Sequence, residues 1–348
     1  MTETPPGLES TLATVESEVG CRVVAARDTG SRARGLAGPD SDYDVDVVFV
    51  QPPVRYATLG GYVASVDRTV ADGRLEVAGW NVRRFGELLV ESNPAALTFL
   101  HSPLRYRDHD ALAALERDVA GQVDPLGLYH HFRSLVGNQH QKYLRRVLLD
   151  DGDPVWVIHD EDETGYEVSP APSAETTAEA SRVEKPTDYS EATTDRTVKR
   201  NLHVGRAGLA ARYVLAAHEF PPLSFDDLLA EIERLRDDGG RLLSGTDDPA
   251  GAVTVHDAWL TTARELAARK RAGEGDATVG DAFGPEFVPP ESVDHRAHAG
   301  SGPDTALVDD CIERLVWEEV ERVASDETEG GVREGADETE GGVRREDT

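Results

Sequence analysis

The alternation of apolar and polar residues divides the chain into a first part with strands and a second part with helices. Apolar positions at helical spacing over 8–20 predict one helix, and short β-branched runs predict strands. The predicted strands cover 21–26, 43–50, 65–70 and 74–78. The predicted later helices cover 82–90, 108–120, 125–149, 194–218, 224–237, 253–271 and 304–324.

This order predicts an α+β fold, in which a small mixed β-sheet domain over 1–107 precedes an α-helical domain over 108–325. Residues 151–193 are rich in Asp, Glu, Ser, Thr and Pro, which predicts a disordered acidic insertion. Residues 326–348 contain the sequence DETEGGVR twice and predict a disordered acidic tail, because such a repeat buries no core.

Length and composition favour an intracellular protein of two parts. The 348 residues are 39% hydrophobic, enough for one large core or two modest ones. Cys21 and Cys311 are too far apart in sequence to suggest a disulfide framework. The polar start of the chain lacks an export signal and no stretch is long enough to span a bilayer, so we expect a cytoplasmic protein without a membrane partner.

The charge of the chain is unusual. The formal net charge is −30, and lysine occurs only at Lys142, Lys185, Lys199 and Lys270. An acidic surface with arginine in place of lysine is typical of a halophilic protein that works in molar salt, where repulsion between like charges is screened. Most carboxylates are therefore expected on solvated surfaces, and a functional carboxylate needs apolar neighbours or a glycine turn beside it.

One segment meets that condition. Gly30 and Ser31 directly follow a predicted strand, and 31–38 is predicted to form a short helical turn whose free N–H groups hold a phosphate. Asp42 and Asp44 stand two residues apart at the entry of the strand over 43–50, so their side chains leave the same face. Two such carboxylates at the mouth of a buried strand suit Mg²⁺ and the displacement of a phosphate group.

The combination of Gly30-Ser31 with Ser41-Asp42-x-Asp44 resembles the DNA-polymerase-β-like nucleotidyltransferase superfamily. Three further segments, 79–84, 92–94 and 100–103, look most like the branch found beside RNA ligases. The resemblance is strong over 20–107 and weaker through the helices that follow.

The resemblance implies a metal-dependent enzyme that moves a nucleoside monophosphate from an NTP to an acceptor hydroxyl and releases pyrophosphate. Gly30 and Ser31, with Arg32 beside them, would bind the nucleotide phosphates. Asp42 and Asp44 would hold Mg²⁺ or Mn²⁺. RNA ends, proteins and small molecules all stay open as acceptors, and RNA end repair is the setting that the resemblance suggests. A non-catalytic member that binds a nucleotide or a partner protein is the alternative.

Glu76 is the predicted third catalytic and metal carboxylate. Strand alternation places Leu75 and Val77 on one face and Glu76 on the other. The family pattern leads us to expect Asp at position 81, where this chain has Asn81, which is expected to cap the next helix instead. A surface role on an edge strand is the competing interpretation for Glu76.

Lys199 is the predicted nucleotide-binding residue outside the first domain. With His203 and Arg206 it falls on one helical face at spacings of four and seven, which suits a phosphate group. A solvated helix face is the alternative. Trp80 is expected in the core, and the histidines at 130, 131 and 140 are expected to pack or to lie at the surface.

Overall fold

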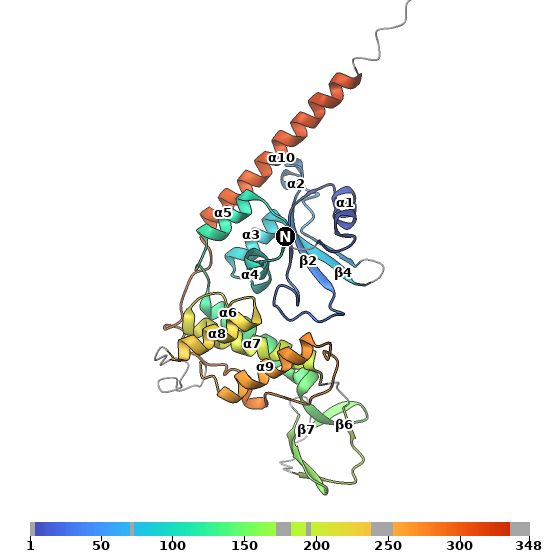
Figure 1. The fold of residues 1–348 in the computed structure, drawn as a ribbon, viewed down its shortest axis with the longest axis vertical. Coiled ribbons are helices and arrows are strands. Elements are labelled where there is room, and N and C mark those ends of the chain that lie inside the picture. The colour runs from blue at the N-terminus through green and yellow to red at the C-terminus, as the bar shows by residue number, and fades with distance from the viewer. Residues whose placement is uncertain (1–3, 70–72, 172–181, 193–195, 238–252, 335–348) are drawn as a thin grey trace, which may run out of the picture. The chain divides into compact units, whose positions relative to one another are not determined.

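The computed structural model describes residues 4–69, 73–171, 182–192, 196–237 and 253–334. The chain forms two compact units, the first made of 1–33, 42–122 and 301–348 and the second of 34–41 and 123–300. This division differs from the expected boundary after residue 107. The first unit also includes α5 (Asp110–Asp118) and α10 (Thr305–Glu334), because α10 packs against α5 and against α3 (Val82–Val90) (Figure 1).

The first unit is built on a mixed five-stranded sheet, which confirms the predicted α+β class. In sheet order its strands are β3 (Ser65–Thr69), β4 (Leu75–Asn81), β2 (Tyr43–Val50), β1 (Arg22–Asp28) and β5 (Arg105–Arg107). Strands β2 and β4 run parallel, and the other neighbours are antiparallel. A short helix, α2 (Val54–Ala57), lies between β2 and β3 in sequence.

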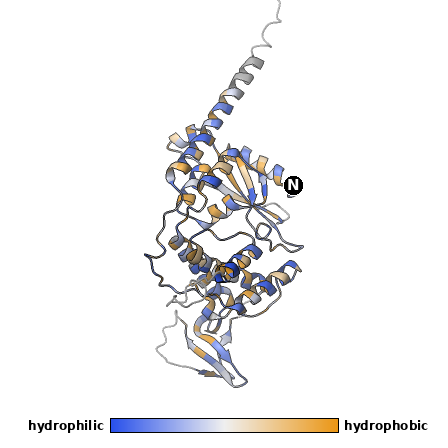
Figure 2. Ribbon diagram, turned by 60° about the vertical axis from the view of Figure 1, so that its left-hand side comes forward, coloured by the Kyte–Doolittle hydropathy of each residue, from blue (hydrophilic) through white to orange (hydrophobic). Residues whose placement is uncertain are grey.

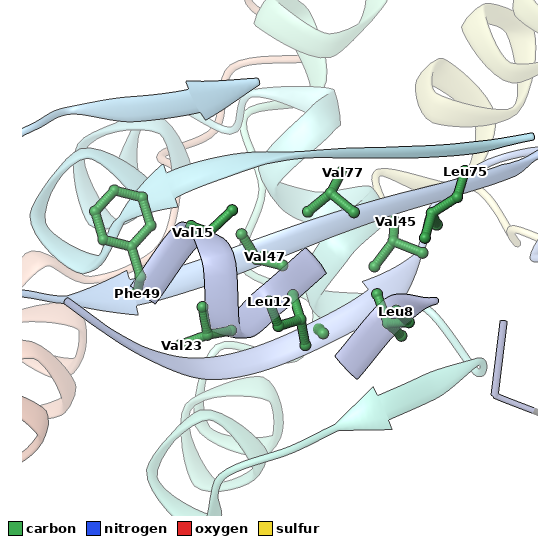
Figure 3. Close-up of a cluster of buried hydrophobic side chains, with 10 residues drawn as sticks. Leu8, Leu12, Val15, Val23, Val45, Val47, Phe49, Leu75 and Val77 are labelled. Carbon is green, nitrogen blue, oxygen red and sulfur yellow. The ribbon is translucent and has the colours of Figure 1, made fainter. Parts of the chain in front are cut away.

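One face of this sheet is covered by the amphipathic helix α1 (Leu8–Val19). Its buried side chains Leu8, Leu12 and Val15 pack on Val45 and Val47 of β2 (Figure 3). Figure 2 shows the hydrophobic residues concentrated along these strands. Since side chains alternate along a strand, burial of Val45 and Val47 turns the carboxylates of β2 to the opposite face.

The opposite face is covered at one end by α3 and α4 (Pro94–His101). Trp80, at the end of β4, lies 6.4 Å from both Phe85 and Phe99 between ring centroids. This packing agrees with the expected core position of Trp80. The β2 carboxylates lie at the other end of the same face. The sequence predicts the phosphate and metal site there.

Helices dominate the second unit, as expected. Its α-helices are α6 (Pro125–Gln139), α7 (Val198–Ala217), α8 (Phe225–Asp237) and α9 (Asp257–Arg271), and α9 packs against α7. Two short segments, the π-helical turn η1 (His140–Leu144) and the 3-10 turn η2 (Pro285–Phe287), complete the helical part. Helix α7 is buried along most of its length, and Phe283 and Phe287 pack directly on Gly205 and Gly208. The helix predicted over 125–149 is wrong in its last part, because the chain leaves the helix at η1 and enters a strand.

The predicted disordered insertion over 151–193 is also wrong for its described residues. Together with the preceding strand β6 (Arg146–Asp150), these residues form a second, antiparallel sheet. Its further strands are β7 (Asp153–Glu161), β8 (Gly165–Pro170), β9 (Arg182–Glu184) and β10 (Ser190–Glu191), and the sheet order is β10-β6-β7-β8-β9. Leu148, Trp156, Ile158 and Val168 form its small core. Side chains of β6, β7 and β8 supply this core, which lets the segment fold despite its acidic composition. Residues 172–181 and 193–195 lie outside the described residues.

The predicted tail begins later than expected. Helix α10 continues to Glu334, because extending an existing helix adds one backbone hydrogen bond for each residue ordered. The rest of the predicted tail, 335–348, lies outside the described residues. Among the residues that are described, no helix combines the length and the apolar character needed to cross a bilayer.

Candidate active site

The parallel pairing of β2 with β4 places two of the predicted carboxylates side by side. Asp44 pairs in register with Glu76, and Asp46 pairs with Ala78. Partners in register point to the same face of a sheet, so Asp44 and Glu76 both leave the face opposite the hydrophobic core. Asp44 is half-buried and Glu76 is exposed. The alternation inferred for Glu76 from the sequence is therefore correct.

Gly30 lies directly against the carboxylate of Asp44. A Cβ atom at position 30 would stand 1.9 Å from Oδ2 of Asp44, much closer than any non-bonded contact allows. The backbone N–H of Thr29 also donates to the carbonyl of Asp44 at 2.9 Å. Only glycine fits at position 30, and the turn after β1 is held against the carboxylate face.

The turn after Gly30 is organised by Asp28, which the sequence analysis passed over. One oxygen of this carboxylate accepts the N–H groups of Gly30 at 3.0 Å and Ala33 at 3.3 Å. Its second oxygen accepts the hydroxyl of Tyr106 at 3.2 Å. Burial raises the pKa of Asp28 above its usual range, although these hydrogen bonds oppose the rise.

The predicted helix over 31–38 is absent from this described segment, which forms turns instead. Asp28 uses two of the N–H groups that the prediction left free for a phosphate. The segment at Gly30 and Ser31 therefore offers a phosphate fewer free N–H groups than a helix N-terminus would. A Thr-Gly preceded by a buried-strand Asp is the signal that would have identified this side-chain cap.

Asp42 and Asp46 occupy different positions from Asp44. Asp42 is exposed and precedes the first residue of β2. Asp46 is half-buried and accepts the hydroxyl of Thr29 at 2.8 Å. The hydroxyl ties Asp46 to the turn that carries Gly30, which gives this carboxylate a local protein partner.

Asn81 serves as the N-cap of α3. Its side-chain oxygen accepts the backbone N–H of Arg83 at 3.0 Å. The capping role expected from the sequence is confirmed. This side chain is committed to the helix start, in register with Phe49 and well beyond the Asp44–Glu76 pair along the strands.

Arg32 packs on an aromatic ring. Its guanidinium carbon lies 3.8 Å from the centroid of Tyr43, a residue that packs with the hydrophobic core beside Leu75. Tyr43 and Asp44 are consecutive in β2 and therefore leave opposite faces. Arg32 therefore stacks on the side of the sheet that carries Tyr43, opposite to the face from which Asp44 leaves.

Next to the turn, the strand β1 is anchored by a buried cation. Arg27 is fully buried and donates to Asp108 at 2.6 Å and to the carbonyl of Phe99 at 3.2 Å. A second carboxylate, on Glu116, lies 3.6 Å away. Arg105 joins both acids to complete the network. Every charge in this network has an opposite charge beside it, which is what burial of a cation requires.

Comparison with known proteins agrees with this geometry. Residues 6–270 match the RNA repair pathway DNA polymerase beta family. The chain belongs to this family. It is also similar to the uncharacterized protein YcgL of Bacillus subtilis (strain 168), with 27% identity over 132 residues, or 38% of this chain and 50% of that protein. The chain thus spans about half the length of this curated relative. The resemblance to a polymerase-β-like branch associated with RNA repair is confirmed.

The match to the RNA repair family extends through α7, which carries Lys199. Lys199 is exposed in the first turn of that helix, and its backbone N–H donates to the carbonyl of Gly275 at 2.8 Å. His203 and Arg206 follow on the same helix, as the spacing predicted. These residues belong to the second unit, whereas Gly30, Asp44 and Glu76 belong to the first.

Members of a polymerase-β-like family generally use a divalent metal, and the carboxylates of this member suit Mg²⁺. In the described residues, no three side chains of His, Cys, Asp or Glu gather as a complete metal site. Mg²⁺ is usually held by one or two carboxylates, and substrate phosphates and waters supply the remaining ligands. Asp44 and Glu76 lie on one sheet face and could supply such a pair of carboxylates, and Asp42 stands two residues before Asp44 along the chain.

Proposed function

We propose that this protein transfers a nucleoside monophosphate from an NTP to a hydroxyl group at an RNA end. Membership of an RNA repair family supports nucleotidyl transfer as the class of reaction. The observation that carries the proposal for this chain is the Asp44–Glu76 register with Gly30 packed against Asp44. An acid pair on one face beside a glycine turn suits a metal-bound triphosphate better than it suits a solvated surface.

In the proposed reaction, the acceptor oxygen attacks the α-phosphorus of the NTP and forms a new P–O bond. The bond from that phosphorus to the pyrophosphate oxygen breaks, and the hydroxyl proton leaves to solvent. Bound Mg²⁺ or Mn²⁺ would neutralise the charge that develops on the phosphate oxygens. Asp42, Asp44 and Glu76 would hold the metal, and the Gly30-Ser31 turn would lie against the phosphates.

The fixed parts of the site have separate tasks. Asp28 holds the Gly30 turn closed, and the Thr29 hydroxyl keeps Asp46 in place. Positioning and electrostatics of this kind account for most of the catalysis in phosphoryl transfer. The turn and the carboxylates therefore act together, and displacement of either should slow the reaction.

The test is transfer of label from α-³²P-labelled NTPs to a panel of acceptors, with pyrophosphate release measured in parallel. The assay should include molar KCl, because a net charge of −30 predicts a protein adapted to high salt. Labelled RNA ends with metal-dependent release of pyrophosphate are expected. Saturable NTP binding without pyrophosphate would instead indicate the non-catalytic alternative, and labelling of a protein or small molecule alone would exclude RNA as the acceptor.

A further inference from the structure

Several cations gather on α7 and on the turn that follows Ser31, all within the second unit. Along α7 they are Lys199, His203 and Arg206, and the charge of Arg34 acts on His203 and Arg206. Arg34 is fixed in the second unit because its carbonyl accepts the N–H of Phe225 at 2.9 Å. In sequence, Arg34 stands three residues after Ser31, so the cation group includes part of the candidate nucleotide-binding segment.

Three of the cations on α7 have no carboxylate beside them among the described residues. Lys199, His203 and Arg206 form no ion pair with a carboxylate in the part of the chain that is described. Among the described residues, the guanidinium of Arg206 donates to the carbonyls of Pro222 and Leu223, at 3.3 and 3.4 Å, and its buried Nε has no hydrogen-bond partner there. Desolvation, followed by the charge of Arg34, lowers the pKa of Arg206 to about 9, so Arg206 stays charged at neutral pH.

The pKa of His203 is affected by desolvation and by the charges of Arg34, Arg206 and Lys199. The side chain of His203 is exposed at the surface and is partly desolvated by neighbouring atoms. This desolvation lowers the pKa of His203, and Arg34, Arg206 and Lys199 lower it further. The three charged side chains that act on His203 are all cations. The electrostatic potential at this ring is therefore positive, although the protein has a net charge of −30.

Helix capping does not explain the placement of these cations. The first turn of α7, all of which is described, carries no acidic residue but contains Lys199 and Arg200. Cations at a helix N-terminus oppose the helix dipole. The N–H groups of Val198, Lys199 and Arg200 already donate to the protein, so this turn presents side chains and not open backbone donors.

An aromatic residue extends the cation group. Tyr143 in η1 lies 4.5 Å from the guanidinium carbon of Arg200 and 4.9 Å from Nζ of Lys142, measured to the ring centroid. Helix α7 packs against η1, so these residues continue from the start of α7. A tyrosine flanked by cations is a stacking surface for a nucleic-acid base.

A second lysine–tyrosine pair in the same unit shows the ordinary alternative. Nζ of Lys185 lies 4.3 Å from the ring centroid of Tyr166. Lys185 also forms an ion pair with Glu161 at 3.0 Å, and the ring of Tyr166 packs on the core of the second sheet. The Lys185 pair is therefore neutralised and structural, which makes it a matched control for Lys142 and Tyr143.

We propose that Arg34, Lys142, Lys199, Arg200, His203 and Arg206, here named the α7 basic strip, bind the phosphates of single-stranded RNA while Tyr143 stacks on a base. The proposal rests on the proposed function, since it assigns the acceptor strand a place in the second unit. From Lys199 to Arg206 the helix rises about 10 Å at 1.5 Å per residue. With Lys199 and Arg206 separated by that length and Tyr143 near the start of the helix, the strip offers separate positions for more than one phosphate and for a base.

The experiment measures binding of a fluorescently labelled single-stranded RNA by anisotropy, without NTP and with EDTA present. Equilibrium titrations cover the range of KCl concentrations in which circular dichroism shows each protein to be folded. The variants are K142Q/K199Q, Tyr143→Ala and Tyr143→Phe, with Lys185→Gln as the matched control. Binding of a fluorescent NTP analogue with Mg²⁺ is measured on the same proteins.

For K142Q/K199Q, we expect weaker RNA binding and a slope of log K against log [KCl] that is less steep by about 1.4, or 0.7 for each cation removed. Tyr143→Ala should weaken RNA binding by about 5- to 100-fold, and Tyr143→Phe should retain most of it. Lys185→Gln should match the natural protein. Because no turnover is involved, these results hold or fail independently of nucleotidyl transfer.

The proposal is overturned if K142Q/K199Q binds RNA with unchanged affinity and slope. It is equally overturned if that variant loses affinity only for the NTP analogue, which would assign the strip to the triphosphate. Equal losses in Lys185→Gln and K142Q/K199Q would indicate a general charge effect and also contradict it. Failure of the transfer assay with RNA binding intact would contradict the proposed function alone.

Discussion

The carboxylate face of the first sheet gathers acidic side chains, and the α7 basic strip gathers basic ones. The two groups differ in how closely the surrounding protein pairs with their charges. The carboxylates have local partners, since Gly30 packs on Asp44 and Thr29 donates to Asp46. Lys199, His203 and Arg206 have no carboxylate partner among the described residues. With 66 acidic and 36 basic residues, a cation here has many potential partners, whereas a carboxylate without one is ordinary.

The comparison shows that charge composition changes what an unpaired group means. In a strongly acidic chain, a cation left without a carboxylate points to an external anion. An acidic pair becomes informative only through its setting, here a buried strand and a glycine turn. Arg27 supports this rule, because the buried guanidinium has collected two carboxylates.

The largest expected effect is on catalysis at the carboxylate face. Asp42→Asn and Asp44→Asn should each lower NTP turnover by at least about 1,000-fold with the fold intact, because each removes charge stabilisation in the transition state. Steady-state pyrophosphate release measures the loss, and circular dichroism checks the fold. Asp67→Asn, an exposed carboxylate on the edge strand β3, is the control and should stay active. Near-normal turnover in the Asp44 variant would contradict the proposed site.

Arg27, which is buried, and Arg206, which is half-buried, offer a direct test of the pairing rule through stability. Arg27→Met should lower the free energy of unfolding by about 3–5 kcal/mol, because it leaves Asp108 and Glu116 without their cation. Arg206→Met should change that free energy by less than about 1 kcal/mol or raise it, because it removes repulsion with Arg34. Denaturant unfolding of both variants in the same salt measures the contrast. Equal destabilisation would show that Arg206 is a structural residue.

Glu76 gives a smaller effect on the carboxylate side. Glu76→Gln should lower turnover by about 10- to 100-fold and weaken Mg²⁺ or Mn²⁺ binding, whereas Asn81→Asp should change little. Turnover titrated with Mn²⁺ separates a metal effect from a loss of structure, since excess metal should restore part of the activity. Full activity of Glu76→Gln at low metal concentration would place Glu76 at the surface without a role.

The smallest expected effect is the pH dependence of RNA binding through His203. The pKa of His203 is lowered below 6.5 in the protein alone, and a bound phosphate should raise it, so binding takes up a proton. RNA affinity should therefore rise as pH falls below 6.5, by less than about tenfold per pH unit. The same lowered pKa makes folding stability decrease over that range, because the unfolded chain binds the proton more readily. His203→Gln should flatten the affinity profile, and an unchanged profile would exclude a role for this ring.

The strands and the carboxylate face were predictable from local patterns. β2 and α3 have the bounds that the sequence predicted. The β-branched residues favour the strand, and the Asn81 cap fixes the residue at which α3 begins. Strand alternation likewise identified the face of Glu76 before its register with Asp44 was known.

Features that depend on distant residues were not predictable. The second sheet was missed because its few apolar residues form a core only when β6, β7 and β8 pair with one another. The turn at 31–35 was mistaken for a helix because Asp28 replaces helical hydrogen bonds with side-chain bonds. Arg34 was missed because no periodicity within the chain links it to α7, far away in sequence.

The assignment of 34–41 to the second unit has a mechanical consequence. The chain passes from one unit to the other after 33 and returns after 41, between the glycine turn and Asp42. The chain crosses between the units again after 122 and after 300, so backbone torsions at four junctions would absorb any motion between the units, and Gly35, with φ of 66°, lies beside the first of them. The proposed nucleotide-binding segment therefore borders one of these junctions, and we expect a strand bound at Arg34 to act on the chain three residues from Ser31.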